Sequence, residues 1–267
     1  MFVPAAARAE TNEVSYSPAG MPVAPGASPP SSIPATLNLP RNAVGSIPAV
    51  VIVHASGGLL PNGPEPDYVA AFTEAGMATF VIDMWTPRGV RAGAAAFGGL
   101  GGIDRRPRTP VDTLPDVFGA LKFLAANPAI DARRIGVMGF SWGAALSSSP
   151  RPNSQPCARW IPNSALRRTP DIISCAGPTY PGGRGQAPWP CHGPVRRSNC
   201  RWRGRTTTTM PTAAPHAWDV KLPGPMTFED RFSHRGRGGP VRFVPDQTVA
   251  AAARSATIAF FQAAFGR

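Results

Sequence analysis

Short apolar runs alternate with helix-like segments along the first half of the chain. The runs "AVVIVHA" (49–55), "MATFVIDMW" (77–85) and "RRIGVMGF" (133–140) are typical of strands covered on both faces. Between them, residues 67–76 and 115–128 carry apolar residues at helical spacing and end at glycine or at Asn-Pro, which favour helix termination. This alternation predicts a parallel sheet wrapped by right-handed crossovers.

Both ends of the chain fit the same architecture. Residues 12–17 and 35–40 alternate polar and apolar positions, as strands do. Residues 245–266 predict a long final helix, whose apolar face includes Val249, Ala253, Ile258, Phe261 and Phe265. We therefore predict a single domain over 1–267 of the α/β class, with a doubly wound, mostly parallel sheet. Because ligands bind such sheets at the carboxyl ends of the strands, functional residues are expected there.

The N-terminus leaves two interpretations open. Residues 1–12 include Ala6-Ala7-Arg8-Ala9, which has the small-x-small spacing of a signal-peptidase site. A signal-peptide remnant would mean export to the periplasm or the medium, whereas an ordinary frayed terminus would leave the protein in the cytoplasm. No run of about 18 apolar residues occurs, so no membrane-spanning helix is predicted.

One segment sets the charge of the whole chain. The net charge is +12, and residues 148–212 supply +9 of it, since they hold ten Arg and the single acid Asp171. The rest is close to neutral, so the charge argues for neither a nucleic-acid nor a membrane partner. The same segment holds all four cysteines without C-x-x-C spacing, which predicts neither a metal site nor a disulfide framework. We expect 148–212 to be irregular.

The motif "GFSWG" (139–143) is the candidate nucleophile site. It has the G-x-S-x-G pattern, follows a predicted strand, and leads into a helix beginning with "GAAL". Gly139 and Gly143 allow the chain to turn sharply, which would leave the Ser141 hydroxyl exposed above the sheet. The alternative is a purely structural turn.

The segment "VIVHASGG" (51–58) supplies small residues directly after a buried strand. Backbone N–H groups of Ser56 and Gly57, together with that of Trp142, are candidates for an oxyanion hole. His54 is a less suitable base, because a histidine at a strand end before glycines more often anchors a loop by hydrogen bonds to the backbone.

These segments resemble the dienelactone hydrolase family of α/β-hydrolases. The resemblance covers about two-thirds of the chain, including the elbow, the strand before "HASGG", "APHAWD" (214–219) and the last helix. Typical members carry Cys at the elbow, where this chain has Ser141, so thiol-specific chemistry is not inherited. The resemblance implies hydrolysis of a small-molecule ester or lactone through an acyl-enzyme, without a metal or organic cofactor. It leaves the oligomeric state open.

"APHAWD" matches the loop where this family keeps its catalytic histidine. The resemblance therefore assigns His216 as the general base and acid that would exchange a proton with Ser141. Without the match, a lone histidine in a loop would be interpreted as a surface residue. His192 and His234 lie in unpatterned sequence and are interpreted as incidental.

The acid of a Ser–His–Asp triad is missing from its expected place. The family keeps it shortly before the histidine, where this chain has Thr206, Thr207 and two further threonines. We hypothesise that residues from about 148 to 212 are translated in a shifted reading frame. Reading one base earlier turns each Thr codon, ACN, into NAC, and the stretch can then be read as "GEDDDYDA". The alternative is a genuine disordered Arg/Pro-rich insertion.

Without a frame correction, the remaining candidates for the acid are Asp171 and Asp219. Three further functions stay open beside the dienelactone hydrolase type. One is a small secreted esterase or acyl-peptide-type hydrolase, and another is a catalytically impaired product of a damaged gene. The third is an Arg-rich nucleic-acid-binding protein, which is disfavoured because the arginines are not interleaved with aromatics on a regular element.

Overall fold

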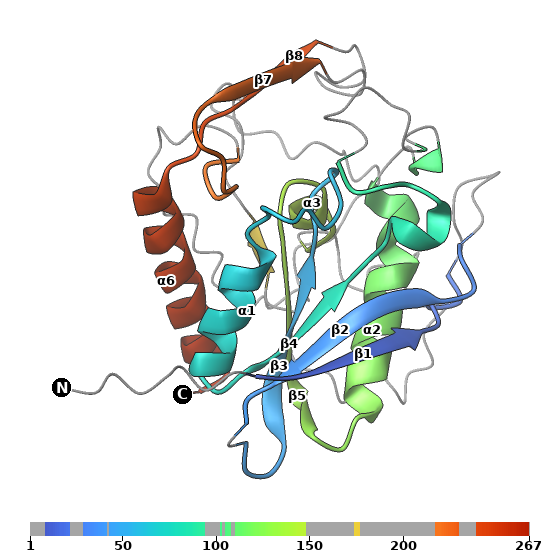
Figure 1. Cartoon of the computed structure of the whole chain (residues 1–267). Coiled ribbons are helices and arrows are strands. Elements are labelled where there is room, and N and C mark those ends of the chain that lie inside the picture. Colours follow the sequence, from blue (N-terminus) through green and yellow to red (C-terminus); the bar gives the residue numbers. More distant parts are fainter. Residues whose placement is uncertain are drawn as a thin grey trace, which may run out of the picture.

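A mostly parallel sheet forms the centre of the molecule in a computed structural model (Figure 1). The structure describes residues 9–21, 29–41, 43–93, 102, 105–107, 110–147, 174–176, 217–229 and 239–266. Within these residues the central sheet has six strands in the order β1-β2-β4-β3-β5-β6. Their bounds are Glu10–Tyr16 (β1), Ile33–Leu39 (β2), Ile47–Val53 (β3), Ala78–Ile82 (β4), Ile130–Gly139 (β5) and Ser174–Ala176 (β6).

The direction of the strands follows from how they are connected. β4, β3, β5 and β6 run parallel, and the connections from β3 to β4 and from β4 to β5 each contain a helix. β1 pairs antiparallel with β2, and β2 pairs antiparallel with β4, at one edge of the sheet. The predicted α/β class with a mostly parallel sheet is therefore confirmed.

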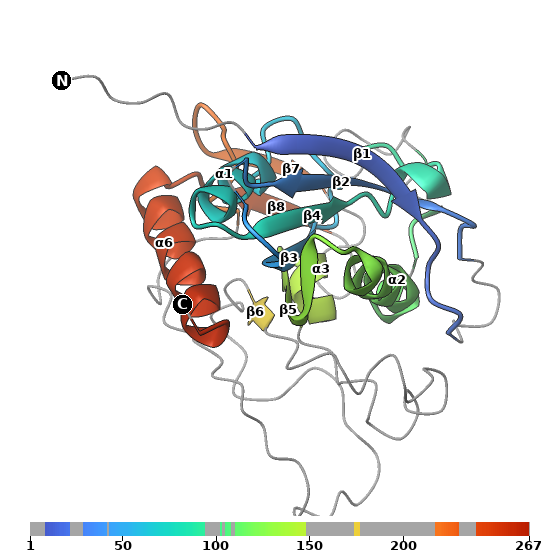
Figure 2. The ribbon, with the colours of Figure 1, turned by 90° about the horizontal axis from the view of Figure 1, so that it is seen from below.

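Helices cover both faces of this sheet (Figure 2). α1 (Glu65–Glu74) and α6 (Gln247–Ala264) lie on one face, while α2 (Leu114–Ala126) and α3 (Trp142–Ser147) lie on the other. Two short 3-10 helices, η1 (Thr86–Arg88) and η3 (Pro110–Thr113), belong to the loops at one end of the sheet. None of the helices described here is both long and apolar enough to cross a membrane.

The continuous apolar run of β3 is explained by its central position. All seven of its residues are buried. Val50 and Ile52 pack towards α1 and α6, whereas Val51 and Val53 belong to the core that contains α2. A strand with helices on both faces needs apolar residues at every position, which is the pattern seen in the sequence.

The last helix returns to the same core as the first half of the chain. Phe261 is fully buried, and its ring meets Phe72 of α1 edge-on, with ring centroids 5.3 Å apart. It also lies so close to Gly136 of β5 that a Cβ atom there would overlap the ring. Asp246 caps the helix by accepting a hydrogen bond from Val249 N at 3.0 Å. The predicted final helix is thus present and packs in the same apolar cluster as residues of β3, β5 and α1.

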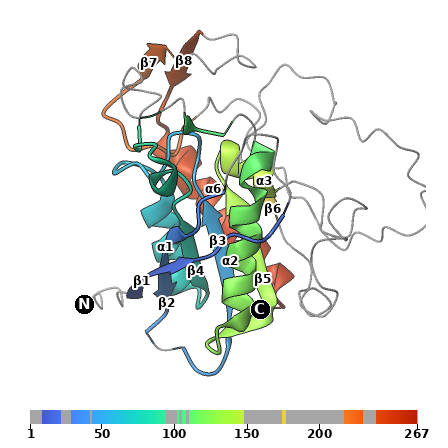
Figure 3. The same cartoon turned by 90° about the vertical axis from the view of Figure 1, so that its right-hand side faces the viewer.

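Two features of the second half were not anticipated. A separate two-stranded antiparallel sheet, β7 (Met226–Glu229) with β8 (Pro240–Phe243), lies beyond the end of the central sheet where Ser141 is found (Figure 3). The segment 148–212, expected to be irregular, falls largely outside the described residues, but β6 lies within it and pairs with the end of β5. Three residues of that segment therefore extend the sheet.

Candidate active site

Ser141 lies at a sharp turn between β5 and α3. Its φ angle is 49°, in the left-handed region, and among the described non-glycine residues only Ala217 shares a positive φ. Such a conformation is costly for a residue with a side chain and is typical of nucleophile elbows. Ser141 is exposed. The strand–turn–helix predicted for "GFSWG" is therefore present, with the serine at its tip.

The two flanking glycines are required by close packing rather than by their own φ angles. A Cβ atom at Gly139 would overlap the backbone of Gly143, and one at Gly143 would overlap the carbonyl group of Val53. Phe140 N donates to Val53 O at 3.1 Å, and Gly143 N donates to Phe140 O at 2.8 Å. The elbow is thus fixed directly against the end of β3.

The loop after β3 forms a tight turn beside the elbow. Gly58 N donates to Ala55 O at 3.0 Å, and Gly57 O accepts from Gly93 N at 2.7 Å. Gly58 has φ +79°, and any side chain there would press on Trp85. Within the described part of the chain, the N–H groups of Ser56 and Gly57 have no acceptor. These two donors therefore remain available at the carboxyl end of β3.

Trp142 contributes a third such donor from the elbow itself. As the first residue of α3, it has a backbone N–H outside the helical hydrogen-bond ladder. Because β3 and β5 are parallel neighbours, with Val53 opposite Gly139, their carboxyl ends meet at one edge of the sheet. The three candidate oxyanion donors and Ser141 thus belong to two adjacent strand ends.

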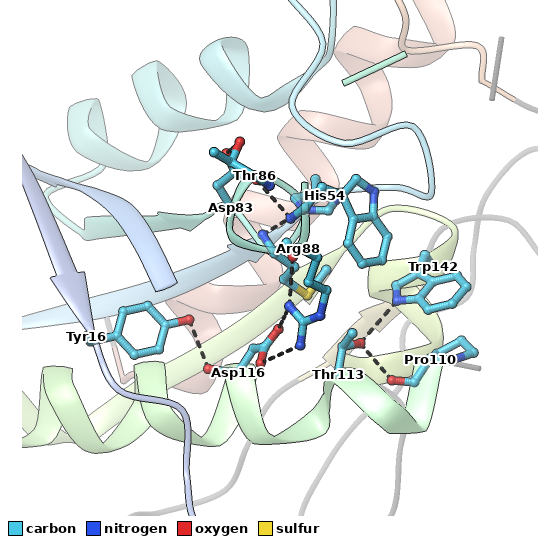
Figure 4. A network of polar contacts seen from close by, with 11 residues as sticks. Tyr16, His54, Asp83, Thr86, Arg88, Pro110, Thr113, Asp116 and Trp142 are labelled. Atoms are coloured by element: carbon cyan, nitrogen blue, oxygen red, sulfur yellow. Dashed lines mark hydrogen bonds and ion pairs between the residues drawn. The ribbon is translucent and has the colours of Figure 1, made fainter. Parts of the chain in front are cut away.

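His54 has a structural role. It is fully buried, its Nδ1 lies 2.7 Å from Ala55 O, and its Nε2 accepts a hydrogen bond from Met84 N at 3.1 Å (Figure 4). Since a backbone N–H can only donate, Nε2 must be unprotonated and Nδ1 carries the proton. Burial lowers the pKa of His54, which keeps the ring neutral. Both nitrogens are occupied, so His54 is not available as a base.

A buried ion pair lies next to this histidine (Figure 4). Arg88 Nη1 donates to Asp116 Oδ2 at 2.8 Å and Nη2 to Oδ1 at 3.1 Å, with side-chain exposures of 8% and 0%. Arg88 also donates to Met84 O at 2.7 Å, and Tyr16 OH donates to Asp116 O at 2.9 Å. Burial raises the pKa of Asp116, and the Arg88 guanidinium opposes that rise. The pair joins the loop after β4 to α2.

The histidine of the predicted triad lies outside the described residues. His216, Asp171, Thr206 and Thr207 are not described, and the described chain resumes at Ala217. From there the loop is anchored near the start of α1. Lys221 N donates to Asn62 O at 2.9 Å, and Lys221 Nζ pairs with Asp67 Oδ1 at 2.6 Å. The chain that follows His216 is therefore fixed at the carboxyl end of the sheet.

Two carboxyl groups, those of the buried Glu65 and the half-buried Asp219, accompany this loop. Burial raises the pKa of Asp219 to about 6. Burial, together with the negative charge of Asp219, raises the pKa of Glu65 to about 7. Among the described residues, no group of three or more His, Cys, Asp or Glu side chains is arranged to hold a metal ion.

Glu65 should make the stability of the protein dependent on pH. A pKa raised from 4.5 to about 7 means that stability is full below about pH 4.5 and is lost as the pH rises to about 7. For this single group the loss is on the order of 3 kcal/mol. We expect Glu65→Gln to remove most of that decline in urea unfolding measured between pH 4 and pH 8. Glu74→Gln, an exposed change at the other end of α1, is the control, and an equal slope in both variants would contradict the prediction.

The sheet order, the elbow and the glycine contacts together define an α/β-hydrolase. Residues 33–162 match the model of the dienelactone hydrolase family. The predicted family resemblance is thereby confirmed.

Several solved structures are similar to this chain. The protein called m3DLH is 17% identical, with a TM-score of 0.50, and the match covers 96% of this chain and 98% of that one. A hypothetical protein from Pseudomonas aeruginosa is 20% identical (TM-score 0.40; 65% of this chain, 44% of that one). The thermophilic carboxylesterase EstE1, from a metagenomic library, is 21% identical (TM-score 0.33; 52% and 39%). The chain thus spans less than half the length of the last two. Among curated proteins, none matches this chain.

Proposed function

We propose that this α/β-hydrolase uses Ser141 as a nucleophile to cleave a small carboxylic ester or lactone through an acyl-enzyme. The observation that carries the proposal is the left-handed φ of 49° at Ser141, directly against the strand end whose loop presents the N–H groups of Ser56 and Gly57. Strain of this kind persists only where the surroundings impose it, and it places the hydroxyl away from the backbone that would otherwise hinder a substrate.

The proposed reaction has two halves. Ser141 Oγ attacks the carbonyl carbon while His216 accepts the hydroxyl proton, and the oxyanion is bound by the N–H groups of Ser56, Gly57 and Trp142. The bond to the leaving oxygen then breaks, and His216 returns the proton to that oxygen. Water, deprotonated by His216, releases the acid and restores Ser141. With a lactone the leaving hydroxyl stays attached to the acyl group, so a single hydroxy acid is released.

Two substrates distinguish the dienelactone hydrolase type from a general esterase or an acyl-peptide-type hydrolase. We expect the protein to hydrolyse both a nitrophenyl ester and a dienelactone, each measured by absorbance. Cleavage of the nitrophenyl ester alone would favour the esterase alternative, and cleavage of neither would overturn the proposal. Asp219 stays a candidate for the acid, and its loss in a serine triad would cost about 10,000-fold in kcat.

A catalytically impaired product of a frameshifted gene is the second candidate. The last helix, α6, shares an apolar cluster with β3, β5 and α1, so the segment 148–212 lies between two parts of the chain that pack together. That segment carries ten Arg, and its only acid is Asp171. The coding DNA should contain compensating insertions or deletions near codons 148 and 212. An intact frame there, together with turnover of either substrate, would reject this candidate.

A further inference from the structure

Two tryptophan rings meet at the elbow. Trp85 follows β4, and Trp142 opens α3, yet their ring centroids lie 5.4 Å apart at an angle of 73°. This edge-to-face arrangement is the favoured geometry for aromatic pairs. The two residues come from different loops, and each of those loops has an anchor of its own.

Trp85 holds the loop after β3. Its indole Nε1 donates to Ser56 O at 3.0 Å, and its ring is almost fully buried. The ring also contacts His54, with centroids 5.0 Å apart, and it closes the space beside Gly58. Since Ser56 O and Gly57 N belong to the same peptide unit, the bond from Trp85 fixes the plane of one of the proposed oxyanion donors.

Trp142 is fixed by a relay through a buried threonine (Figure 4). Its indole Nε1 donates to Thr113 Oγ1 at 3.1 Å, and Thr113 Oγ1 donates in turn to Pro110 O at 2.7 Å. Thr113 is fully buried, so its hydroxyl has one orientation in which both bonds are made. The Arg106 guanidinium lies 5.3 Å from the centre of the Trp142 ring. The side chain of Trp142, and with it the first turn of α3, is therefore held from two sides.

We infer that Trp85 and Trp142 form a tryptophan clamp that fixes the two halves of the oxyanion hole relative to each other. One half is the Gly57 N–H on the loop after β3, and the other is the Trp142 N–H on the elbow. Both must reach one oxygen at about 3 Å, and a misplacement of about 1 Å can cost on the order of 100-fold in rate. The inference rests on the proposed function, and it assigns Trp85 and Thr113 as positioning residues.

The choice of residue type fits this role. Tryptophan alone combines a large apolar ring with an N–H that can only donate. Phenylalanine at either position would keep the ring contact and lose the anchor. The contact between the rings and the hydrogen bonds that anchor them can therefore be separated by mutation.

Two variants test the clamp. Trp85→Phe removes the bond to Ser56 O, and Thr113→Val removes the relay while keeping the shape of the side chain. We expect each to lower kcat for the nitrophenyl ester by about 10-fold with little change in KM, because the oxyanion forms only in the transition state. An aryl boronic acid, which forms a tetrahedral adduct at the serine, should bind more weakly by the same factor. Thr113→Ser should restore both values.

The clamp also predicts non-additivity. Once one half of the oxyanion hole is misplaced, the second change should cost less, so the double variant should lose less than the product of the single effects. Matched controls are Thr257→Val and Thr73→Val, which remove hydroxyl bonds to Ala253 O in α6 and Val69 O in α1, on the face of the sheet opposite α3. These controls should lower stability without lowering kcat.

The outcomes separate the clamp from the proposed function. If Ser141→Ala abolishes turnover but Trp85→Phe and Thr113→Val behave like the two controls, the clamp is overturned and the proposed function stands. If the unmodified protein hydrolyses neither substrate, the proposed function fails, and the clamp fails with it. Should Trp85→Phe not fold, Thr113→Val and its serine rescue decide the question alone.

Discussion

Replacing Ser141 by alanine is expected to lower kcat for ester hydrolysis by at least about 1000-fold. Alanine removes the attacking oxygen but keeps the Cβ atom and the turn, so the loss should come without a loss of fold. Relief of the φ strain is small, because alanine also has a Cβ atom. Steady-state turnover of a nitrophenyl ester measures the change.

Ser32→Ala is the matched control, since Ser32 is exposed just before β2. It should turn over the ester at the unmodified rate. If Ser141→Ala kept a tenth or more of the activity, another residue would be the nucleophile, and the elbow would have only a structural role.

The Arg88–Asp116 pair carries the largest expected effect on stability. Arg88→Met should destabilise the protein by about 3–5 kcal/mol, because Asp116 is left fully buried without a compensating charge. The free energy of unfolding in urea measures this cost. A weaker effect on catalysis should accompany it, since Arg88 also bonds the backbone of Met84, which in turn donates to His54.

An exposed pair and a double variant provide the comparison. Arg133 pairs with Asp131 at 3.4 Å, but its side chain is 80% exposed, so Arg133→Met should cost no more than about 1 kcal/mol. Arg88→Met combined with Asp116→Leu should regain much of the loss, since no charge then remains buried. Equal losses in the free energy of unfolding for Arg88→Met and Arg133→Met would contradict this role of the buried pair.

The sheet could be predicted because strands that are buried on both faces have continuous apolar sequences. Every position of β3 is apolar, and the helices that cover it show their own spacing. The short strands β7 and β8 were missed because four residues with alternating burial are too short a pattern to stand out among prolines and charged residues. Strand β6 lay in a segment whose composition favours no regular structure.

The elbow was predictable because it is local. Ser141 and its two glycines lie within five consecutive residues, and each glycine has a steric reason in the structure. The contacts that support it are not local. Thr113 and Trp142 are 29 residues apart, as are Ser56 and Trp85, and no pattern in the sequence links either pair. Gly58 was the one sign of these contacts in the sequence, because a run of small residues after a buried strand indicates close packing.

For the charged and titratable residues, too, contacts between distant parts of the chain leave no sign in the sequence. The sequence places Arg88 in a loop and Asp116 at the start of a predicted helix, and it gives no sign that both become buried. Glu65 lies two residues before the helix predicted over 67–76, and nothing in the sequence indicates that it is buried in the fold. His216 stays a prediction because it falls outside the described residues, and so does the choice of acid between Asp171, which is also outside them, and Asp219.

Covalent labelling tests most directly whether Ser141 is the nucleophile of an α/β-hydrolase. Purified protein would be treated with a fluorophosphonate, digested, and its peptides analysed by mass spectrometry. The account predicts one phosphonylated peptide, modified at Ser141, which is lost in Ser141→Ala and persists in Ser32→Ala. An unlabelled protein, or an adduct on a different serine, would contradict it.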